Sequence, residues 1–252
     1  MIIRCKESNR EEVLTYVKQD VVMNLFIIGD IETYGFDSQF QTVFMDREYD
    51  NIKTVYLVYR RNLVIGSAQG IVDQGFVEKL VKEYGLIDIN GDYKIIKQLN
   101  LGDFKLEKCK IAMLESLDKK IDSPAVELEI GDLEAMVTDC QRIFNRKIDL
   151  EQEKDNFEKG TSRYYGCKVG GRLVSGARTS AHCDWAAMII GVYALEQYRN
   201  QGYGLATVYR LCHDFLEQGK KLCLFYNDPF AARLYHRLGF KDHGDYGLLR
   251  LK

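Results

Sequence analysis

The sequence predicts a mixed α/β fold, and three patterns lead to this expectation. Two runs of alternating apolar and polar residues, 162–169 and 171–178, flank a Gly-Gly dipeptide, which is a strong signal for a β-hairpin turn. Residues 186–194 form a continuous apolar run, as in a strand that is buried on both faces. Residues 205–216 repeat apolar side chains at 205, 208, 212 and 215, which is the period of an amphipathic helix.

The first half of the chain has weaker patterns of the same two kinds. Residues 10–19 have helical spacing, with Val13, Leu14 and Val17 on one face, and an apolar stretch follows at 21–31. The other elements expected here are strands at 54–60 and 63–68 joined by Arg61-Asn62, a helix at 76–84, and short strands at 95–101 and 110–115.

The second half is easier to interpret, and its hairpin, buried strand and helix are joined by five more elements. We expect a strand at 125–130, a helix through Leu133 and Ile143 capped by Asp132, a strand at 222–226, a helix at 230–238 ending at Gly239, and a strand at 245–251. Gly219 ends the helix at 205–216. The expected order is β-α-β-β-β-α-β-α-β.

The length of the chain, 252 residues, allows one large domain or two small ones. A charged and polar stretch at 118–124, which ends in one of the two prolines, is the best candidate boundary. We therefore expect one domain at residues 1–122 and a second at 123–252.

The charge composition bears on partners and location. The sum of Lys and Arg is 35 and that of Asp and Glu is 37, which gives a net charge of −2. This balance argues against nucleic acid and anionic membranes as partners. No apolar run approaches the roughly 18–20 residues of a membrane helix, and the first twelve residues are too charged for a signal peptide. The expected location is the cytoplasm.

Cysteine and histidine show no ligand spacing. The seven cysteines include no CxxC pair, and the four histidines form no HExxH motif. We therefore expect neither a disulfide framework nor a metal site. Small, buried, apolar side chains in a reducing compartment explain these cysteines best.

One segment suggests chemistry: residues 192–206, with the sequence VYALEQYRNQGYGLA. It joins the end of the buried strand to a helix through a loop that contains Gly202 and Gly204. Glycines leave the backbone N–H groups open to an anion, and the start of the helix favours a phosphate or pyrophosphate. Arg199 can add a charge-assisted contact. An ordinary turn with glycines is the alternative. The loop lacks the Gly-Lys-Ser/Thr of a Walker motif and the third glycine or alanine of a dinucleotide fingerprint.

Two signatures in this half resemble those of the GNAT superfamily of N-acyltransferases. The sequence RNQGYG at 199–204 matches the pattern Arg/Gln-x-x-Gly-x-Gly/Ala, and DPFAARLYHRLGF at 228–240 resembles the pattern Asn-x-x-Ala-x-x-Leu-Tyr-x-x-x-Gly-Phe. The resemblance covers about residues 123–252. It implies the GNAT fold, a mixed and mostly antiparallel sheet flanked by helices, in a tandem arrangement with a degenerate GNAT-like half at residues 1–122.

The resemblance also implies an acetyl-CoA or acyl-CoA site in a V between the strands that end near Ala194 and Tyr226. The implied cofactor-binding residues are Val192, Tyr193, Ala194, Arg199, Asn200, Gln201, Gly202, Tyr203, Gly204, Leu205, Ala206, Asn227, Asp228 and Ala231. Tyr235 falls on the tyrosine that protonates the departing CoA thiolate in this family, and a core aromatic is an equal alternative for it.

Three departures from the family pattern limit these assignments. Glu196 stands where the loop usually has proline, and Asp228 stands where the second signature begins with asparagine, so that Asn227 is an alternative. The strand around 188–192 has no carboxylate for a general base. Glu196, Asp184, His182, a water chain or a group from the first half remain candidates for that role.

The function expected from the resemblance is transfer of an acetyl group from acetyl-CoA to a primary amine, by direct attack in a ternary complex. The acceptor would be a small molecule or a peptide, and the protein a monomer or homodimer. Asp30, Glu32 or Tyr34 could face a cationic amine, with packing and capping as the alternative. A non-catalytic acyl-CoA sensor is the second hypothesis. An aminoacyl transferase using charged tRNA is a third, which the balanced charge disfavours.

Overall fold

The computed structural model describes residues 1–36, 38–49 and 51–252, and these form two compact units. The first unit contains Met1–Ala112, Phe225–Asn227 and Asp242–Lys252, and the second contains Met113–Leu224 and Asp228–Lys241. The expected division at residues 1–122 and 123–252 stays a prediction about domains. The compact units differ from it mainly because the end of the chain lies with the first unit.

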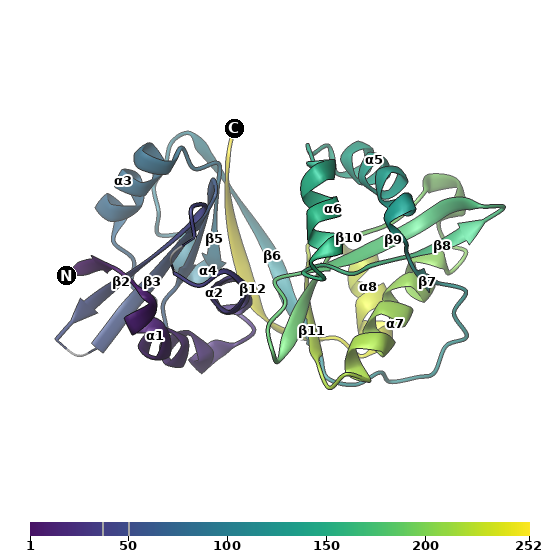
Figure 1. Ribbon diagram of the computed structural model, residues 1–252, viewed down its shortest axis with the longest axis horizontal. Helices are drawn as coiled ribbons and strands as arrows, with labels where there is room; N and C mark the ends of the chain where they lie inside the picture. Colours follow the sequence, from purple (N-terminus) through teal and green to yellow (C-terminus); the bar gives the residue numbers. More distant parts are fainter. Residues whose placement is uncertain (37, 50) are drawn as a thin grey trace. The chain divides into compact units, whose positions relative to one another are not determined.

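The first repeat of elements occupies the N-terminal part of the chain (Figure 1). Its strands are β1 (Ile2–Arg4), β2 (Gln41–Glu48), β3 (Asn51–Tyr59), β4 (Asn62–Gly66), β5 (Asp88–Asp92) and β6 (Phe104–Leu114). Its helices are α1 (Arg10–Val17), α2 (Leu25–Tyr34), α3 (Gln74–Tyr84) and α4 (Tyr93–Ile96), and short 3-10 turns lie at Glu7–Asn9 and Lys18–Asp20.

The second repeat follows in the same order. Its strands are β7 (Val126–Glu127), β8 (Tyr164–Val169), β9 (Arg172–Ser180), β10 (Ala186–Ala194), β11 (Lys221–Tyr226) and β12 (Lys241–Leu251). Its helices are α5 (Leu133–Phe144), α6 (Leu150–Glu158), α7 (Tyr203–Leu216) and α8 (Pro229–Leu238), and 3-10 turns lie at Ile130–Asp132 and Glu196–Tyr198. Each repeat reads strand, two helices, three strands, helix, strand, helix, strand.

The strand pairing is mixed and mostly antiparallel, as the sequence predicts. In the first unit the order is β1-β2-β3-β4-β5-β12-β6, and in the second it is β11-β10-β9-β8-β7. Among the pairs described within each unit, β4 with β5 and β10 with β11 are parallel, and the others are antiparallel. Strand β12, the last element of the second repeat, pairs with β5 of the first unit, with Leu248 opposite Asn90.

The second unit has a core on each face of its sheet. On one face α5 and α6 cover a cluster that includes Met136, Cys140, Tyr164 and Tyr193. On the other, α7 packs on β8 and β9 through a small cluster of Ala125, Cys167, Val174 and Ala206. In the first unit, α3 and α4 contribute to a larger apolar cluster that includes Tyr56, Leu80 and Leu249.

Three expectations about local structure were wrong. Residues 95–101 form no strand, because the short helix α4 and the turn after it occupy them. The expected order of the second half lacks α6. Asp132 stands at the N-cap position of α5, but its carboxylate accepts from the Glu129 N–H at 3.1 Å and pairs with Lys168, so it closes the preceding 3-10 turn instead.

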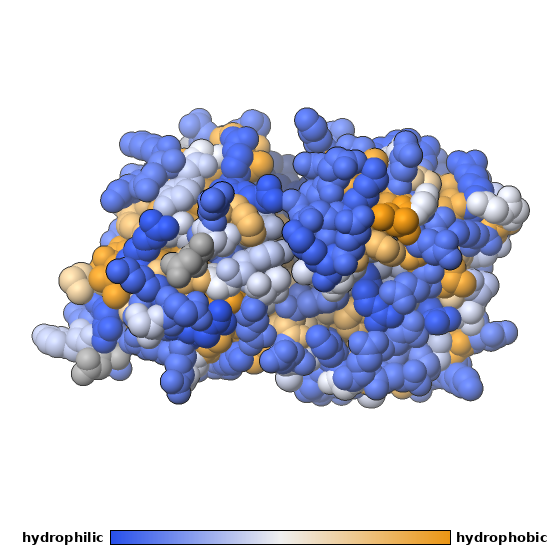
Figure 2. Space-filling model, viewed as in Figure 1, coloured by the Kyte–Doolittle hydropathy of each residue, from blue (hydrophilic) through white to orange (hydrophobic). Residues whose placement is uncertain are grey.

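The described residues include no helix that is long and apolar enough to cross a membrane. The face of the molecule in Figure 2 is mostly hydrophilic, with apolar residues in small separate patches. Large apolar side chains that are exposed, such as Phe40, Ile71 and Phe230, come from distant parts of the chain. Single exposed apolar residues are normal for a folded protein.

Candidate active site

The central feature of the second unit is the end of β10. The strand pairs with β11 from Ala186 to Ile189, opposite Lys221 to Leu224, and the pairing stops there. Strand β10 continues to Ala194, and its last five residues have no described partner on the β11 side. Unpaired N–H and C=O groups on a strand edge are a template for another extended backbone. The end of β10 is therefore open to an extended amide-bearing ligand.

A bulge bends β10 at this point. Its register against β9 shifts between Ile190 and Tyr193, and Gly191 has a φ of +63°. A side chain is strained in that conformation, so glycine is the residue that suits it. Tyr193 directs its side chain into the core, where its ring lies on Gly176. The main chain of Val192, Tyr193 and Ala194 is thus what β10 can offer a ligand.

The loop after β10 leads into α7 through two glycines. Gly202 precedes the helix with a φ of +90°, and among the described residues no side chain caps the first turn. Gly204 is the second helical residue, and a Cβ there would lie 3.7 Å from Leu234 Cδ1 and 3.9 Å from Ala194 Cβ. The first turn of α7 therefore adjoins the end of β10 and one side of α8. Its N–H groups and the helix dipole favour an anion.

A buried polar cluster holds this first turn on the sheet. The Tyr203 carbonyl accepts from Ser175 Oγ at 3.3 Å and from Cys167 Sγ at 3.6 Å. The Thr207 hydroxyl lies 2.7 Å from Ser175 Oγ, and both residues are fully buried. Hydrogen-bonded buried hydroxyls fix the position of the groups that they join. The backbone of the first turn is therefore held before any ligand arrives.

The loop residues Arg199, Asn200 and Gln201 are exposed. Arg199 Nε donates to the Ala194 carbonyl at 3.3 Å, so its guanidinium lies where β10 ends. Gln201 donates to the Gln197 carbonyl at 2.8 Å, and Asn200 has a φ of +60°. The loop is tied together by these contacts, while Arg199 keeps other N–H groups for a ligand.

The second predicted signature lies on α8. Asp228 caps this helix by accepting from the Phe230 N–H at 2.9 Å, and Pro229 takes the first helical position. Ala231 is partly exposed in the first turn, and Asn227 is exposed in the segment that clusters with the first unit. Leu234 brings α8 beside Gly204. The structure thus brings part of α8 to the first turn of α7.

Tyr235 is 6% exposed and packs against Phe240, with ring centroids 5.8 Å apart. Burial raises the pKa of its phenol well above 10, with smaller contributions from Cys212 and Asp228. The phenol therefore stays protonated across the physiological range. It can donate a proton or a hydrogen bond, and it cannot serve as a base.

The three general-base candidates of the second half lie in different surroundings. Glu196 and Asp184 are exposed. His182 is partly buried, and its Nε2 forms a hydrogen bond with Thr179 Oγ1. Its ring packs edge-on against Phe215, with ring centroids 5.4 Å apart. Burial first, and then Lys220 and Arg163, lower the pKa of His182 to about 4. The imidazole is therefore neutral at pH 7.

A buried charged group beside the bulge was not predicted from the sequence. Glu153 on α6 pairs with Arg178 on β9 at 2.8 Å and accepts from the Tyr164 hydroxyl at 2.7 Å. A Cβ on Gly191 would lie 3.7 Å from Arg178 Nε. The glycine inside the apolar run at 186–194 was the available signal, because an isolated glycine in a strand often marks a bulge.

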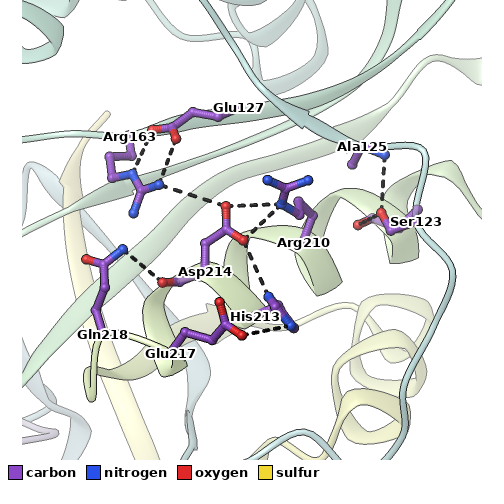
Figure 3. Close-up of polar contacts among 10 residues, drawn as sticks. Ser123, Ala125, Glu127, Arg163, Arg210, His213, Asp214, Glu217 and Gln218 are labelled. Atoms are coloured by element: carbon purple, nitrogen blue, oxygen red, sulfur yellow. Dashed lines mark hydrogen bonds and ion pairs between the residues drawn. The ribbon is translucent and has the colours of Figure 1, made fainter.

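The outer side of α7 is held by a second charged network (Figure 3). Arg163 on the β8 side forms two bonds of 2.7 Å with Glu127, and Arg210 and Asp214 pair along the helix at 2.9 Å. Asp214 also lies 3.9 Å from Arg163. These contacts hold the middle and the end of α7. None of them involves a residue of its first turn.

Comparison with known proteins gives the class of this site. Residues 132–240 match the family model described as the acetyltransferase (GNAT) family. A search of curated proteins found no match. A GNAT-family acetyltransferase from Colwellia psychrerythraea is 13% identical with a TM-score of 0.61, and each chain is covered over 100% of its length.

Two other solved structures are similar over the whole chain. A GCN5-related N-acetyltransferase from Sphaerobacter thermophilus is 13% identical, with a TM-score of 0.65, over 99% of this chain and 94% of its own. A Drosophila protein is 11% identical, with a TM-score of 0.74, over 100% and 98%. At such identities the likeness concerns the fold.

The family match identifies residues 132–240 as an acetyltransferase domain of the GNAT family, which is a class of acyltransferases. The solved structures show that the fold of the whole chain is shared with proteins of this kind.

Proposed function

We propose that this protein transfers the acetyl group of acetyl-CoA to a primary amine. The observation that carries the proposal is that two features adjoin. The first turn of α7, which no described side chain caps, lies directly beside the end of β10, which has no described partner on the β11 side. The first feature suits a pyrophosphate, and the second suits an extended chain of amides. Coenzyme A combines both groups in one molecule.

The residues present fit such a ligand. The N–H groups from Asn200 to Ala206 would hold the pyrophosphate, with Arg199 as a second contact. Gly204 carries no Cβ, so the pyrophosphate can approach the helix closely. The main chain of Val192 and Ala194 would pair with the amides of the pantetheine arm. The acyl end would then lie near the bulge at Gly191.

Acetyl-CoA supplies an activated acetyl group as a thioester. The nitrogen of a neutral amine attacks the acetyl carbon, so a C–N bond forms, the C–S bond breaks, and the nitrogen loses one proton. A backbone N–H near Ala194 would stabilise the charge on the acetyl oxygen, and the rigid end of β10 would orient the thioester. The CoA thiolate leaves and takes up a proton.

Tyr235 is the proposed donor of that proton. Its burial keeps the phenol protonated, and Leu234 beside it places this part of α8 at the α7 turn. We expect Tyr235→Phe to lower kcat by about 100-fold, the usual scale of general acid catalysis, with acetyl-CoA affinity unchanged. Full turnover by the variant at saturating substrates would remove Tyr235 from the mechanism.

The first experiment measures thermal stabilisation of the full chain by acetyl-CoA, with NAD and ATP as controls. A ligand at 100 times its Kd raises the free energy of unfolding by about 2.7 kcal/mol. Stabilisation by acetyl-CoA alone supports the cofactor assignment, and stabilisation by NAD or ATP alone contradicts it. A CoA-release assay on a panel of small-molecule and peptide amines then separates an enzyme from an acyl-CoA sensor, which would bind without turnover.

A further inference from the structure

Helix α2 of the first unit carries a distinctive stripe of side chains. Phe26, Asp30 and Tyr34 are four residues apart, so they lie on one face of the helix. All three are partly exposed, whereas the opposite face, with Ile27, Ile28 and Ile31, is fully buried. We call the three residues the α2 stripe. Its centre is a carboxylate, and both of its ends are aromatic.

The Asp30 carboxylate has no hydrogen-bond or ion-pair partner within the described ranges 1–36, 38–49 and 51–252. The contact made by the residue is through its backbone carbonyl, which accepts from Gln41 Nε2 at 3.2 Å. Glu32, two residues further on, pairs with Lys18 at 2.8 Å. Burial raises the pKa of Asp30 to about 7, because the charged form is poorly solvated. The carboxylate is short of a positive partner.

Phe26 and Tyr34 flank Asp30 one turn away on either side of it along the helix, and further aromatic residues pack next to them. Phe26 stacks on Phe225 with centroids 5.9 Å apart, and Phe225 lies 4.4 Å from Tyr246. The charge of Asp30 contributes to the raised pKa of Tyr34 and of Tyr246, so both phenols lie close to it. These aromatic residues offer π faces to a ligand, and their rings carry no net charge that would compete with it for Asp30.

Beyond the far end of the stripe, two rings that pack against Tyr34 already bind a cation of the chain itself. Tyr34 packs against Phe40 and Tyr59 at 5.1 and 5.6 Å. The Arg60 guanidinium lies 5.4 Å from the Phe40 centroid and 5.8 Å from that of Tyr59. Cations over aromatic faces gain about 0.5–2 kcal/mol, and more where water is excluded. The same chemistry is available, without an occupant from the described residues, around Asp30.

We propose that the α2 stripe is a binding site for an organic ammonium ion. One carboxylate neutralises the charge, and the rings of Phe26 and Tyr34 cover the alkyl groups. A divalent metal ion is a poor match, because it takes six or more oxygen ligands and the described residues contain no group of three or more His, Cys, Asp and Glu that could hold it. The site lies in the first unit and does not depend on acetyl transfer.

The test titrates the full chain with choline and, in parallel, with 3,3-dimethylbutan-1-ol, its uncharged isostere, by calorimetry or NMR. Choline is expected to bind and the alcohol to bind at least about tenfold more weakly, a difference of about 1.4 kcal/mol. Asp30→Asn should weaken choline binding by about tenfold or more. Glu32→Gln, on the same helix with an occupied carboxylate, should leave it unchanged.

Any of four results would overturn the proposal. Three concern the wild type: a choline affinity equal to that of Asp30→Asn, a choline affinity equal to that of the alcohol, and choline binding that is undetectable at about 10 mM. The fourth is unchanged choline affinity in Phe26→Leu, which keeps the carboxylate and should weaken binding about three- to tenfold through the lost π face. Asp30→Asn removes a poorly solvated charge, so a thermal melt should show a folded and more stable protein.

Discussion

The two repeats share one order of elements, yet their fourth strand and third helix meet in different ways. Strand β4 pairs with β5 over Asn62–Ile65 and ends at Gly66, whereas β10 makes four equivalent pairs with β11 and then continues to Ala194. Helix α3 is capped by Asp73, which accepts from the Phe76 N–H at 2.9 Å, whereas α7 has no side-chain cap among the described residues. At these two places the described residues of the first repeat satisfy more of the backbone groups than those of the second, where we propose that coenzyme A binds.

The loop of the first repeat is also filled by side chains. Gly66 lies under α2, where a Cβ would meet Asn24 at 2.6 Å. The N–H of Ala68 donates to Tyr16, and that of Ile71 to Ser67. The second residue of each helix is glycine, but a Cβ on Gly75 would lie 3.5 Å from the Asp73 carboxylate. A negative charge of the chain itself stands where the second repeat is open to an anion. Under the proposed function, the anion site of the second repeat is open, and the equivalent place in the first repeat is closed by Asp73.

The largest expected effect concerns Glu153, the buried acid on the second helix of the second repeat. Glu153→Ala would leave Arg178 buried without its partner, so we expect the free energy of unfolding to fall by about 3–5 kcal/mol. Urea denaturation measures this loss. Replacing both Glu153 and Arg178 by leucine should restore most of it. A single variant as stable as the wild type would show that the pair contributes nothing beyond packing.

The next effect tests the contrast between the two helix N-termini. Gly204→Glu places a carboxylate at the first turn of α7, where its Cβ makes ordinary contacts, and should weaken acetyl-CoA binding by about 100-fold, or about 2.7 kcal/mol. Gly75→Glu makes the same change at the second residue of α3 and should leave the affinity intact. Calorimetry on both variants decides the matter. Equal losses, or none, would contradict the assignment of the site to α7.

A smaller effect depends on pH. The pKa of Asp30 is about 7 in the folded protein and about 4 in the unfolded chain, so this group stabilises fully below pH 4 and the contribution is lost as pH rises through 7. Asp30→Asn should therefore gain about 2 kcal/mol over the wild type at pH 9, allowing for partial exposure, and nothing at pH 4. Unfolding curves at both pH values test this. A gain that is the same at both would contradict it. The nearby phenols of Tyr34 and Tyr246 stay neutral over this range.

The smallest effect concerns the two aspartate caps. Asp73→Ala and Asp228→Ala each remove one side-chain cap at 2.9 Å, and each should cost about 1 kcal/mol of stability. Asp73→Ala should leave acetyl-CoA affinity unchanged. If Asp228 contacts the cofactor as proposed, Asp228→Ala also weakens binding. Equal affinities for the two variants would make Asp228 a cap only.

Local patterns predicted the parts of the fold that local forces determine. The hairpin of β8 and β9 appears around Gly170-Gly171, and the helix expected at 205–216 begins two residues earlier, at Tyr203. Helix α6 was missed because its sequence, LEQEKDNFE, has few apolar residues and one of its buried contacts is the charge of Glu153. Strand β5 was missed for a similar reason: its buried Asn90 is satisfied by Asn62 and Tyr246.

The candidate site was predicted only in part. The anion-binding loop was predicted from Gly202 and Gly204, because closely spaced glycines before a helix are typical of loops that bind phosphate. The break in pairing beyond Ile189 and the bulge at Gly191 depend on neighbouring strands, which a single sequence does not reveal. A single sequence also does not reveal that the Asp30 carboxylate has no partner among the described residues. Such features arise from tertiary packing, which overrides local preference.

The position of β12 has a consequence for how the chain is made. Strand β5 emerges from the ribosome long before its partner, because Leu248 of β12 lies opposite Asn90 of β5 and the two are far apart in the sequence. The N-terminal unit must therefore wait, with one edge of β5 open, until β12 has been synthesised. Long-range pairing of this kind is slow, and open edges invite association with other chains. Neither half is expected to behave well when expressed alone: one would lack a strand, and the other would carry an extra one.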